Sequence, residues 1–319
     1  MQAVCFAHCA LLQTKRAAHV MRQYVCQGWD CKKRANPIIL IGMFKKGKSV
    51  SSVVHSAVQP FPVVILGGTT EAASLCRHLE QDARFNATLS LAGVTRAPHL
   101  PDLPVKIGGF GGVQGLKNWL QENGIRAVVD ATHPFAATMS HNAATACTDL
   151  ALPLLRLERP AWQPTEQDNW HAAASLAEAA MALANPGGWD KTPATVFLTT
   201  GRKDTRPFQD APRHHYILRS IEPPDEAALP PHTTLITARG PFGLDDELRL
   251  LRAYEVDVLV SKNSGGDATF PKIQAARILN IPVIMIERPH PSPAPVVATA
   301  ENALQWLLRH QSASTLRDV

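Results

Sequence analysis

Residues 63–72 read VVILGGTTEA, a continuous apolar run that ends in two glycines and passes directly into a polar segment. An uninterrupted apolar run is typical of a strand that is buried on both faces of a parallel sheet. After it, Ala72, Leu75, Cys76 and Leu79 recur with helical spacing. The stretch therefore predicts a strand, a tight glycine turn and a helix, which is the repeating unit of an α/β fold.

The same alternation continues through the rest of the chain. Further strands are expected within 88–93, 104–109, 126–134, 152–160, 194–201, 216–221, 234–240, 257–266 and 281–289. Helices are expected within 70–81, 115–124, 136–150, 172–184, 244–254, 270–280 and 301–310. A polar, aromatic segment at 161–170 interrupts the pattern. We expect two doubly wound, Rossmann-like α/β domains, 61–160 and 161–319, with mostly parallel sheets and an interdomain cleft.

Basic residues are concentrated near the amino terminus. Residues 1–60 contain nine Lys or Arg and one acid, whereas residues 61–319 contain 23 Lys or Arg and 26 Asp or Glu. The body of the chain is therefore mildly acidic and lacks the general basic surface of a nucleic-acid-binding protein. We expect residues 1–60 to be a basic extension, either disordered or preceding the true start of translation. A transit peptide, or an interaction tail for nucleic acid or an anionic membrane, is the alternative.

Cysteine usage points to a reducing compartment. Four of the six cysteines lie in the first 31 residues, but their C-x3-C and C-x4-C spacing differs from that of metal knuckles, so no metal site is expected. Cys76 and Cys147 occur singly within helical patterns, as buried free thiols do. No apolar run is long enough to span a membrane, and the sequence predicts a cytoplasmic protein.

One motif in the extension competes with this interpretation. In IILIGMFKKGKSV, residues 38–50, Gly42, Gly47, Lys48 and Ser49 match the phosphate-loop pattern G-x-x-x-x-G-K-S. A P-loop nucleotide-dependent enzyme is therefore the alternative function. A working phosphate loop follows a strand and opens a long helix of its own domain, whereas here two prolines follow within about a dozen residues. We interpret the match as accidental.

The glycine turn at 67–72 is the first candidate ligand site. The N-terminus of the helix after it offers backbone N–H groups and the positive end of the helix dipole to an anion. Compared with the dinucleotide fingerprint G-x-G-x-x-G/A, Gly67 and Ala72 fit, while Thr69 replaces the middle glycine. A tight turn before a helix capped by Thr69 would explain the same residues.

The segment after the second strand favours a phosphorylated cofactor. NAD-specific sites place an acid about 20 residues after the fingerprint, but Ala83–Pro101 contains no Asp or Glu. Thr95 and Arg96 instead offer a hydroxyl and a fork-shaped cation suited to a 2′-phosphate. This predicts NADPH, with a solvated surface arginine as the alternative.

Two more strand exits complete this half. In GGFGG, residues 108–112, four glycines around an aromatic residue let the backbone lie close to a flat or phosphorylated ligand. DATHPFA, residues 130–136, leaves a strand at the carboxyl edge, where such sheets bind ligands. Asp130 could instead cap the turn, and His133 could be a hydrogen-bonded structural histidine.

Strand exits in the second half carry cations and amides, in TTGRKD (199–204), TARGPF (237–242) and SKNSGG (261–266). If these strands are neighbours, the cations converge and favour a polyanionic ligand. The cations in question are Arg202, Lys203, Arg239 and Lys262. The alternative is surface pairing with Asp204, Asp245 and Asp246.

In order and spacing, these motifs resemble those of one family, the precorrin-6A reductases of cobalamin biosynthesis. The resemblance runs from Val63 to near His310, and DATHPFA with KNSGG is its most specific part. It implies that residues 61–160 bind NADPH, or NADH if the substrate is the cobalt form, and that residues 161–319 bind the tetrapyrrole. It also implies the reduction of one C=C bond to give precorrin-6B, by hydride transfer plus protonation.

The resemblance assigns individual residues as well. Those expected to face the cofactor are Gly67, Gly68, Thr69, Thr70, Thr95, Arg96, Gly108, Gly109, Phe110, Gly111, Gly112, Asp130, Ala131 and Thr132. Those expected to face the substrate are Arg202, Arg239, Lys262, Asn263 and Ser264. From the chemistry of the reduction, we take Lys262 as the first candidate proton donor or electrostatic helper, and His133 as the second. The expected partners are a polycarboxylate tetrapyrrole, whose acetates and propionates would pair with the cations, and other enzymes of the corrin pathway. Neither nucleic acid nor membrane is expected.

Overall fold

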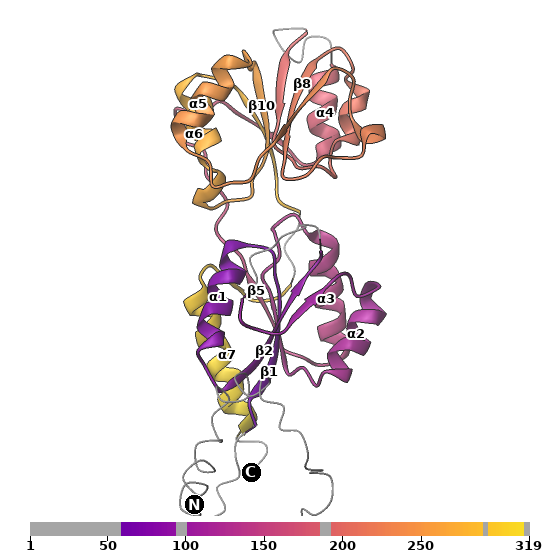
Figure 1. Cartoon of the computed structure of the whole chain (residues 1–319), viewed down its shortest axis with the longest axis vertical. Helices are drawn as coiled ribbons and strands as arrows, with labels where there is room; N and C mark the ends of the chain where they lie inside the picture. The colour runs from indigo at the N-terminus through magenta and orange to yellow at the C-terminus, as the bar shows by residue number, and fades with distance from the viewer. Residues whose placement is uncertain (1–58, 94–100, 186–192, 290–292, 316–319) are drawn as a thin grey trace, which may run out of the picture. The chain divides into compact units, whose positions relative to one another are not determined.

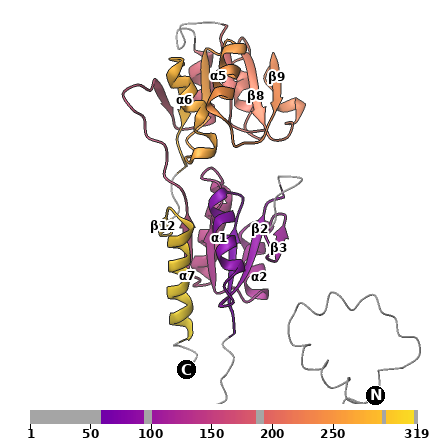
Figure 2. The same cartoon turned by 60° about the vertical axis from the view of Figure 1, so that its left-hand side comes forward.

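The computed structural model describes residues 59–93, 101–185, 193–289 and 293–315. The candidate phosphate loop and the Thr95–Arg96 pair lie outside these residues. The described chain forms two six-stranded sheets, here called sheet A and sheet B, in which every strand pair is parallel (Figures 1 and 2). The predicted α/β class with largely parallel sheets is confirmed.

Sheet A is covered by helices on both faces. Its strands, in spatial order, are β12 (Val296–Val297), β5 (Leu154–Leu157), β4 (Ala127–Asp130), β1 (Phe61–Leu66), β2 (Phe85–Leu91) and β3 (Val105–Ile107). One face packs on α1 (Thr70–Glu80) and α7 (Ala300–Thr315), and the other packs on α2 (Gly112–Glu122) and α3 (Ala137–Asp149) (Figure 1).

The apolar run of β1 follows from this double coverage. Val63 and Ile65 belong to the core under α1 and α7, whereas Val64 and Leu66 belong to the core under α2 and α3. All four side chains are at most 2 % exposed. Because successive side chains of a strand point to opposite faces, only a strand buried on both faces needs such a run.

Sheet B has the same layered construction. Its strands, in spatial order, are β6 (Trp170–Ala173), β11 (Val283–Ile286), β10 (Val258–Lys262), β7 (Thr195–Leu198), β8 (His215–Ser220) and β9 (Thr233–Thr237). One face packs on α5 (Leu244–Ala253) and α6 (Pro271–Ile278), the other on α4 (Leu176–Ala184) and the 3₁₀ helix η2 (Arg206–Asp210). Two further 3₁₀ helices are η3 (Glu226–Ala228) and η4 (Asp267–Thr269).

The two sheets share one strand order but exchange their sixth strands. Strands β1 to β5 of sheet A occupy the same relative places as β7 to β11 of sheet B. However, β6 follows β5 in sequence and pairs with β11, while β12 follows β11 and pairs with β5. The chain therefore passes between the sheets twice, once after β5 and once after β11.

This exchange changes the predicted division of the chain. The boundary expected at residue 160 left everything after it in the second domain, but β12 and α7 belong to sheet A. The apolar face of α7, with Ala303, Trp306 and Leu307, packs against the sheet A core. Sheet A and its helices thus comprise residues 61–157 and 296–315. Neither β6 nor β12 was predicted as a strand.

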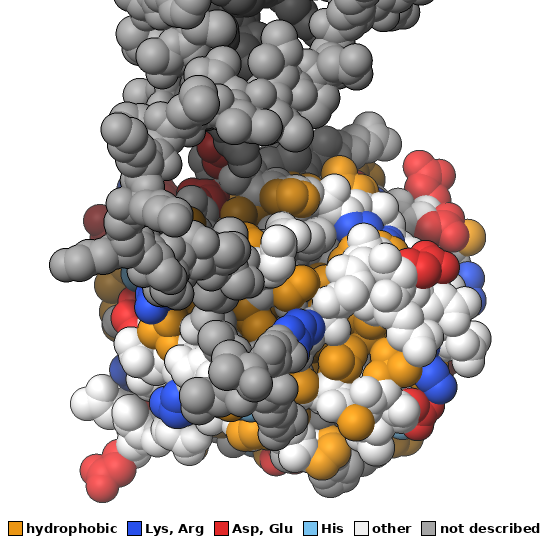
Figure 3. All heavy atoms as spheres, turned by 90° about the horizontal axis from the view of Figure 1, so that it is seen from below, with side chains coloured by type: hydrophobic (Ala, Val, Ile, Leu, Met, Phe, Trp, Pro, Cys, Tyr) orange, Lys and Arg blue, Asp and Glu red, His pale blue; other side chains and the backbone are white. Residues whose placement is uncertain are grey.

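The remaining sequence expectations concern thiols, spans and surface charge. Cys76 and Cys147 are free and buried as predicted, and burial raises the pKa of their thiols to about 11 and about 12, respectively. Within the described ranges, no helix is both long and apolar enough to cross a membrane, and no three His, Cys, Asp or Glu side chains form a metal-binding group. On the face seen in Figure 3, acidic and basic side chains lie next to one another at the right-hand edge, and hydrophobic side chains lie toward the middle.

Candidate functional site

The strand order places four of the predicted ligand turns, those after β1, β4, β7 and β10, at two topological switch points, whereas the turns after β3 and β9 follow edge strands. In sheet A the order reverses between β1 and β4, where Leu66 pairs with Asp130. In sheet B it reverses between β7 and β10, where Leu198 pairs with Val260. Ligands of open α/β sheets bind outside the carboxyl ends of the strands at such points. The exits of these four strands therefore form the candidate site.

The turn after β1 presents unused backbone donors. The N–H groups of Gly68, Thr69 and Thr70 have no hydrogen-bond partner in the described part of the chain. Gly68 has a φ of +123°, and the space where a side chain would lie is empty. At Gly67 a Cβ atom would lie 2.5 Å from Leu89 Cδ1, so close strand packing also requires glycine there. These donors at the start of α1 fit a pyrophosphate.

The hydroxyl of Thr69 is already engaged. Thr69 Oγ1 accepts a hydrogen bond from the Ala72 N–H at 3.1 Å and donates to the Ala131 carbonyl at 2.9 Å. It therefore caps α1 and joins the turn after β1 to the turn after β4. The capping interpretation of Thr69 is correct, and only its backbone remains for a ligand.

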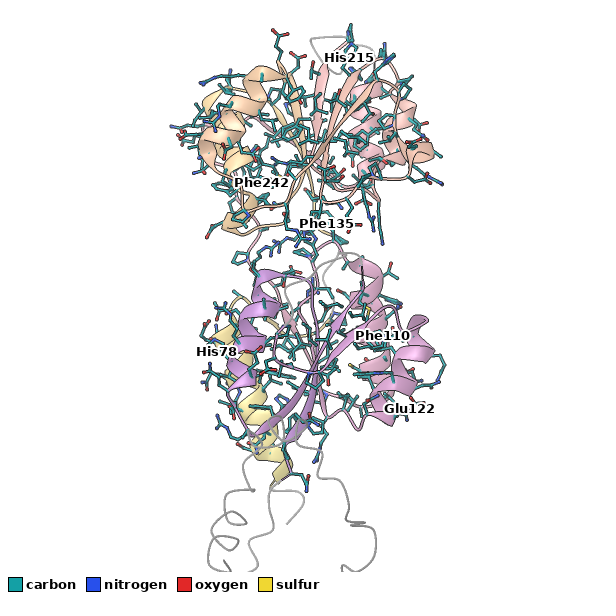
Figure 4. The ribbon with its side chains drawn as sticks, in the orientation of Figure 1. His78, Phe110, Glu122, Phe135, His215 and Phe242 are labelled. Atoms are coloured by element: carbon teal, nitrogen blue, oxygen red, sulfur yellow. The ribbon has the colours of Figure 1, made fainter. Side chains whose placement is uncertain are left out.

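The GGFGG turn after β3 is open but uses its aromatic side chain internally. Gly108, Gly111 and Gly112 have positive φ angles, and no atom lies within 4 Å of a Cβ built on any of them. The ring of Phe110 packs edge-on against Trp119, with ring centroids 5.4 Å apart, as part of the core under α2 (Figure 4). Gly109 is equally open. The backbone of the turn is thus accessible, whereas the predicted ligand contact by the Phe110 ring is not favoured.

Asp130, at the end of β4, is the centre of a buried network. Its Oδ1 accepts hydrogen bonds from the Thr132 N–H at 3.1 Å and the Thr132 hydroxyl at 2.7 Å. Its Oδ2 lies 2.6 Å from Arg156 Nη1, and Arg156 also pairs with Glu158 at 2.6 Å. Asp130 is 1 % exposed. The carboxylate therefore fixes the turn after β4, as the capping alternative supposed.

His133 is held in its neutral form. Its Nδ1 accepts the Phe135 N–H at 3.2 Å, so the neutral ring carries its proton on Nε2. Burial lowers the pKa of His133 to about 3, aided by the charges of Arg159, Lys262, Arg288 and Arg156. Near neutral pH the Nε2–H of this side chain can donate a hydrogen bond, but the ring is not protonated and cannot act as a general acid.

Lys262, at the end of β10, lies close to the turn after β4 of the other sheet. Its ammonium forms an ion pair with Asp204, which follows β7. The same ammonium lies 5.3 Å from the ring centroid of Phe135, whose side chain packs against the sheet B core (Figure 4). The two candidate proton donors, Lys262 and His133, are therefore brought together from different sheets.

The other two predicted substrate residues after β10 form hydrogen bonds that stabilise the loop in which they lie. The Asn263 amide accepts the Trp162 N–H at 2.8 Å and donates to the Trp162 carbonyl at 3.0 Å. Ser264 is buried, and its carbonyl accepts hydrogen bonds from Arg159 and Arg288. The Asn263 side chain and the Ser264 carbonyl therefore hold the loop after β10 in its conformation.

The remaining predicted cations are spread along the edge of sheet B. Arg202, after β7, pairs with Glu222 at 2.8 Å. Arg239, after the edge strand β9, is exposed and forms no ion pair with any described residue. Lys203 is exposed, and Asp204 pairs with Lys262. Pairing at the surface thus accounts for part of the predicted cluster, whereas Arg239 and Lys203 form no ion pair with the residues that the structure describes.

Two arginines missed by the sequence analysis hold the β10 exit in place. Arg159 Nε donates to the carbonyls of Ser264 and Gly265 at 2.8 and 3.0 Å, and its Nη1 binds Glu71 Oε2 at 2.8 Å. Arg288 Nε donates to the Asn263 carbonyl at 2.9 Å. Arg159 thereby connects the first turn of α1 in sheet A to the loop that carries Lys262 in sheet B.

A signal for these arginines was present in the sequence. The tripeptide Glu-Arg-Pro occurs at 158–160 and again at 287–289, at the ends of the corresponding strands β5 and β11. In both places the chain crosses to the other sheet. Glu158 of the first copy also binds Arg288 of the second, with Oε1 and Nη1 2.7 Å apart. The repeat marks the two crossings.

Glu71 adds a carboxylate beside the candidate pyrophosphate turn. Burial alone would raise its pKa, but its backbone hydrogen bond at the start of α1 and the charge of Arg159 together lower the pKa. The group is therefore ionised near neutral pH and remains paired with Arg159.

A second buried cation lies behind the β10 exit. Lys272, in the first turn of α6, is 4 % exposed, and its ammonium lies 5.1 Å from the Trp162 ring centroid. Burial, followed by the repulsion of Arg219, lowers its pKa to about 7. The neighbouring Arg219 is buried against Glu247 at 2.6 Å. Sheet B thus carries buried as well as exposed cations at this edge.

Most of the chain matches one protein family. Residues 62–308 match the family described as Precorrin-6x reductase CbiJ/CobK, and the candidate phosphate loop lies outside that range. A precorrin-6A reductase of Rhodococcus erythropolis is 46 % identical over 77 % of this chain and 96 % of its own length. One of Sinorhizobium sp. is 44 % identical over 79 % of this chain and 96 % of its own length.

A solved structure is also similar. The structure described as CobK precorrin-6A reductase has a TM-score of 0.71 and 42 % identity, and the match covers 78 % of this chain and 97 % of that one. The family match over most of the chain and the identity and coverage of these relatives show that the proteins are homologous. The chain belongs to the Precorrin-6x reductase CbiJ/CobK family.

Proposed function

We propose that this chain catalyses the NADPH-dependent reduction of one C=C bond of precorrin-6A to give precorrin-6B, a step of cobalamin biosynthesis. The main observation behind the proposal is that the switch points of the two sheets offer different groups to a ligand. One offers the unpartnered N–H groups of residues 68–70 at a helix start, and the other offers the ammonium of Lys262. Relatives named for precorrin-6A, without cobalt, support the metal-free substrate.

The cofactor would lie across the β1 and β4 exits of sheet A. Gly67, Gly68, Thr69 and Thr70 would bind the pyrophosphate through their backbone. Thr95 and Arg96 would bind the 2′-phosphate, and the open backbone of 108–112 would lie against the adenosine half. The turn at 130–133 would border the nicotinamide, with the Nε2–H of His133 as a hydrogen-bond donor.

The substrate would occupy a cleft bordered by the sheet B exits. A polycarboxylate macrocycle needs cations at several points around its rim, and Arg202, Arg239 and Lys262 follow three different strands. Asn263 and Ser264 would contribute by fixing the loop of Lys262. We place the second domain at residues 170–286 and group 296–315 with the cofactor domain.

The reduction adds a hydride to one ring carbon and a proton to its neighbour. NADPH, when bound, supplies the hydride and leaves as NADP⁺. We assign the proton to Lys262, because His133 is neutral at physiological pH and already has its Nδ1 occupied. After the transfer the lysine is neutral, and water returns its proton. Asp204 holds the ammonium in place between turnovers.

The test is NADPH oxidation with precorrin-6A and with its cobalt form, measured side by side with NADPH and NADH. The proposal expects turnover with precorrin-6A and NADPH. Turnover with the cobalt form alone would reassign the substrate, and a preference for NADH would overturn the cofactor assignment. Absence of oxidation with either tetrapyrrole would refute the function.

A further inference from the structure

Lys106 forms a fixed positive charge that the proposed function does not use. Its Nζ donates to the carbonyls of Gly108 and Gly109 at 3.0 and 3.1 Å. On another side the ammonium lies 4.1 Å from the ring centroid of Phe110. Since an ammonium has three N–H groups, these contacts hold it in one place and leave one donor unassigned.

No carboxylate neutralises this charge. Among the described residues, Lys106 forms no ion pair with Asp or Glu, and it is only partly exposed. Lys117, eleven positions along the chain and on α2, gives the contrast, because its Nζ lies 2.8 Å from Asp149 Oδ2. A cation that is immobilised by neutral carbonyls and an aromatic face keeps its full attraction for an incoming anion.

The position of Lys106 identifies the anion. Lys106 is the register partner of Ser90 in the neighbouring strand β2, and the Gly108 N–H donates to the Leu91 carbonyl at 2.9 Å. The ammonium, bound to Gly108 and Gly109, therefore lies beside the carboxyl end of β2. In dinucleotide-binding sheets of this strand order, the adenosine ribose and its 2′ substituent lie at the end of this strand.

We propose that Lys106 is a specificity-determining residue that binds the 2′-phosphate of NADPH through its remaining N–H group. The inference rests on the proposed function, because it presupposes that the dinucleotide binds at the β1 and β4 exits. It differs from a purely structural role, in which Lys106 only closes the 108–112 turn. A structural role affects NADPH and NADH equally, whereas a 2′-phosphate contact affects NADPH alone.

The experiment compares Lys106→Met, Lys106→Arg and the control Lys117→Met in the full chain. Dissociation constants for NADPH, NADH, 2′-AMP and 5′-AMP are measured by calorimetry, and the midpoint of thermal unfolding is recorded for each variant. Loss of a charge-assisted hydrogen bond predicts roughly 10- to 100-fold weaker NADPH binding by Lys106→Met, with NADH changed by less than about twofold. Lys106→Arg keeps the preference for NADPH, and Lys117→Met changes neither constant.

Each other outcome has a definite meaning. Equal weakening of NADPH and NADH by Lys106→Met, or unchanged NADPH binding, overturns the inference and leaves the proposed function in place. A wild-type chain that binds NADH as tightly as NADPH contradicts the cofactor assignment itself. If Lys106→Met lowers the unfolding midpoint too far for titration, Lys106→Gln, which keeps a polar side chain of similar length without the charge, decides. Selective weakening of NADPH binding in Lys106→Gln supports the inference, whereas equal weakening of both cofactors, or unchanged NADPH binding, overturns it.

Discussion

Sheets A and B have the same strand order, yet their corresponding exits carry different chemistry. After β1 the chain passes through two glycines directly into the eleven-residue helix α1, whereas after β7 it passes through Gly201, Arg202 and Lys203 into the five-residue 3₁₀ helix η2. A long helix offers backbone N–H groups and its dipole to a phosphate. Because the turn after β7 leads into no such helix, we expect sheet B to bind its ligand through side-chain cations. The fold fixes where ligands bind, and the loop composition decides which ligands they are.

The two crossings differ in a second way. Arg159 and Arg288 follow corresponding strands, but both donate to the backbone of the β10 exit in sheet B. Neither has a hydrogen bond to the backbone of the β4 exit among the bonds of the described chain. The loop that carries Lys262 is therefore clamped from two sides, while the β4 turn is fixed internally by Asp130.

The largest expected effect concerns the one cation that we place at the reacting atoms. Lys262→Met should lower kcat by about 10²- to 10⁴-fold, the usual contribution of a general acid, because the other candidate donor, His133, is neutral near physiological pH. The dissociation constant of NADPH should stay within about twofold, because we propose that the cofactor binds at the strand exits of sheet A. Single-turnover kinetics and calorimetry check both. Asp204→Asn, which removes only the partner, is the control, and kcat unaltered in Lys262→Met would remove this residue from the mechanism.

Matched glycines at the two switch points should differ in their structural roles. At Gly265, φ is +69° and an added Cβ would lie 2.1 Å from the Pro160 carbonyl oxygen, whereas Gly68 has open space beside it. Gly265→Ala should therefore lower the free energy of unfolding by about 3–5 kcal/mol, from backbone strain and a steric clash together. Gly68→Ala should cost about 1–2 kcal/mol from strain alone. Urea denaturation measures both, and equal losses would contradict the close packing of the β10 exit on the crossing.

Lys272 is the second residue of α6, which follows β10. The corresponding helix of sheet A is α3, which follows β4 and begins with Ala-Thr, so sheet A has no lysine at this position. Its pKa is lowered to about 7 in the folded chain and is 10.5 in the ordinary state. Burial of its charged form therefore destabilises the folded state below about pH 7, and this cost fades as the pH rises toward about 10. Relative to the wild type, Lys272→Met should gain about 2–4 kcal/mol at pH 6.5, and less at about pH 9.5.

Chemical denaturation of Lys272→Met and the wild type at the two pH values provides this measurement. Lys203→Met, which removes an exposed lysine of the same sheet, is the control and should show no such pH dependence. A stability difference that stays constant, or grows with pH, would mean that the folded chain does not depress the pKa of Lys272.

The smallest expected effects concern Arg159 and Arg288, the two arginines that donate hydrogen bonds to the loop after β10. Arg159 and Glu71 are partly exposed, so their pairing is partly screened by solvent. Arg159→Met should lower the free energy of unfolding by about 1–2 kcal/mol and raise the substrate KM by about 3- to 10-fold, because the β10 exit loses two hydrogen bonds. Arg288→Met should change the free energy of unfolding and the substrate KM by similar amounts, but it leaves the ion pair between Arg159 and Glu71 intact.

A double-mutant cycle separates the two arginines. Arg159→Met and Glu71→Gln should show a coupling energy of about 0.5–1 kcal/mol, whereas Arg288→Met and Glu71→Gln should be additive. Coupling of Glu71 to Arg288, or none to Arg159, would show that the described ion pair does not connect the two sheets in solution.

Local pattern was sufficient for most of the fold because buried parallel strands have a strong signature. The runs at 63–66, 127–129 and 283–286 are apolar on both faces, and each lies in a strand. Strand β6 contains exposed residues and β12 has two residues, so neither has a pattern to detect. The amphipathic pattern of α7 predicted a helix but could not tell which sheet it covers, since both sheets need helices.

The positions of the candidate site residues could be predicted from the sequence better than the interactions of their side chains. Strand ends identified the glycine turns and Lys262, because parallel strands bring their carboxyl ends to one edge. The partners of Asp130, Asn263 and Thr69 come from distant segments, and no local pattern announces that these side chains are already occupied. The arginines of the two Glu-Arg-Pro copies were visible only by comparing the two halves of the chain.

The most direct test of the account is a crystal structure of the chain with NADP⁺ and precorrin-6A. The account predicts the pyrophosphate within hydrogen-bond distance of the N–H groups of residues 68–70, and tetrapyrrole carboxylates on Arg202 or Arg239 with the reacting carbon beside Lys262. A dinucleotide bound at the β7 and β10 exits, or a tetrapyrrole held without any of these cations, would contradict it.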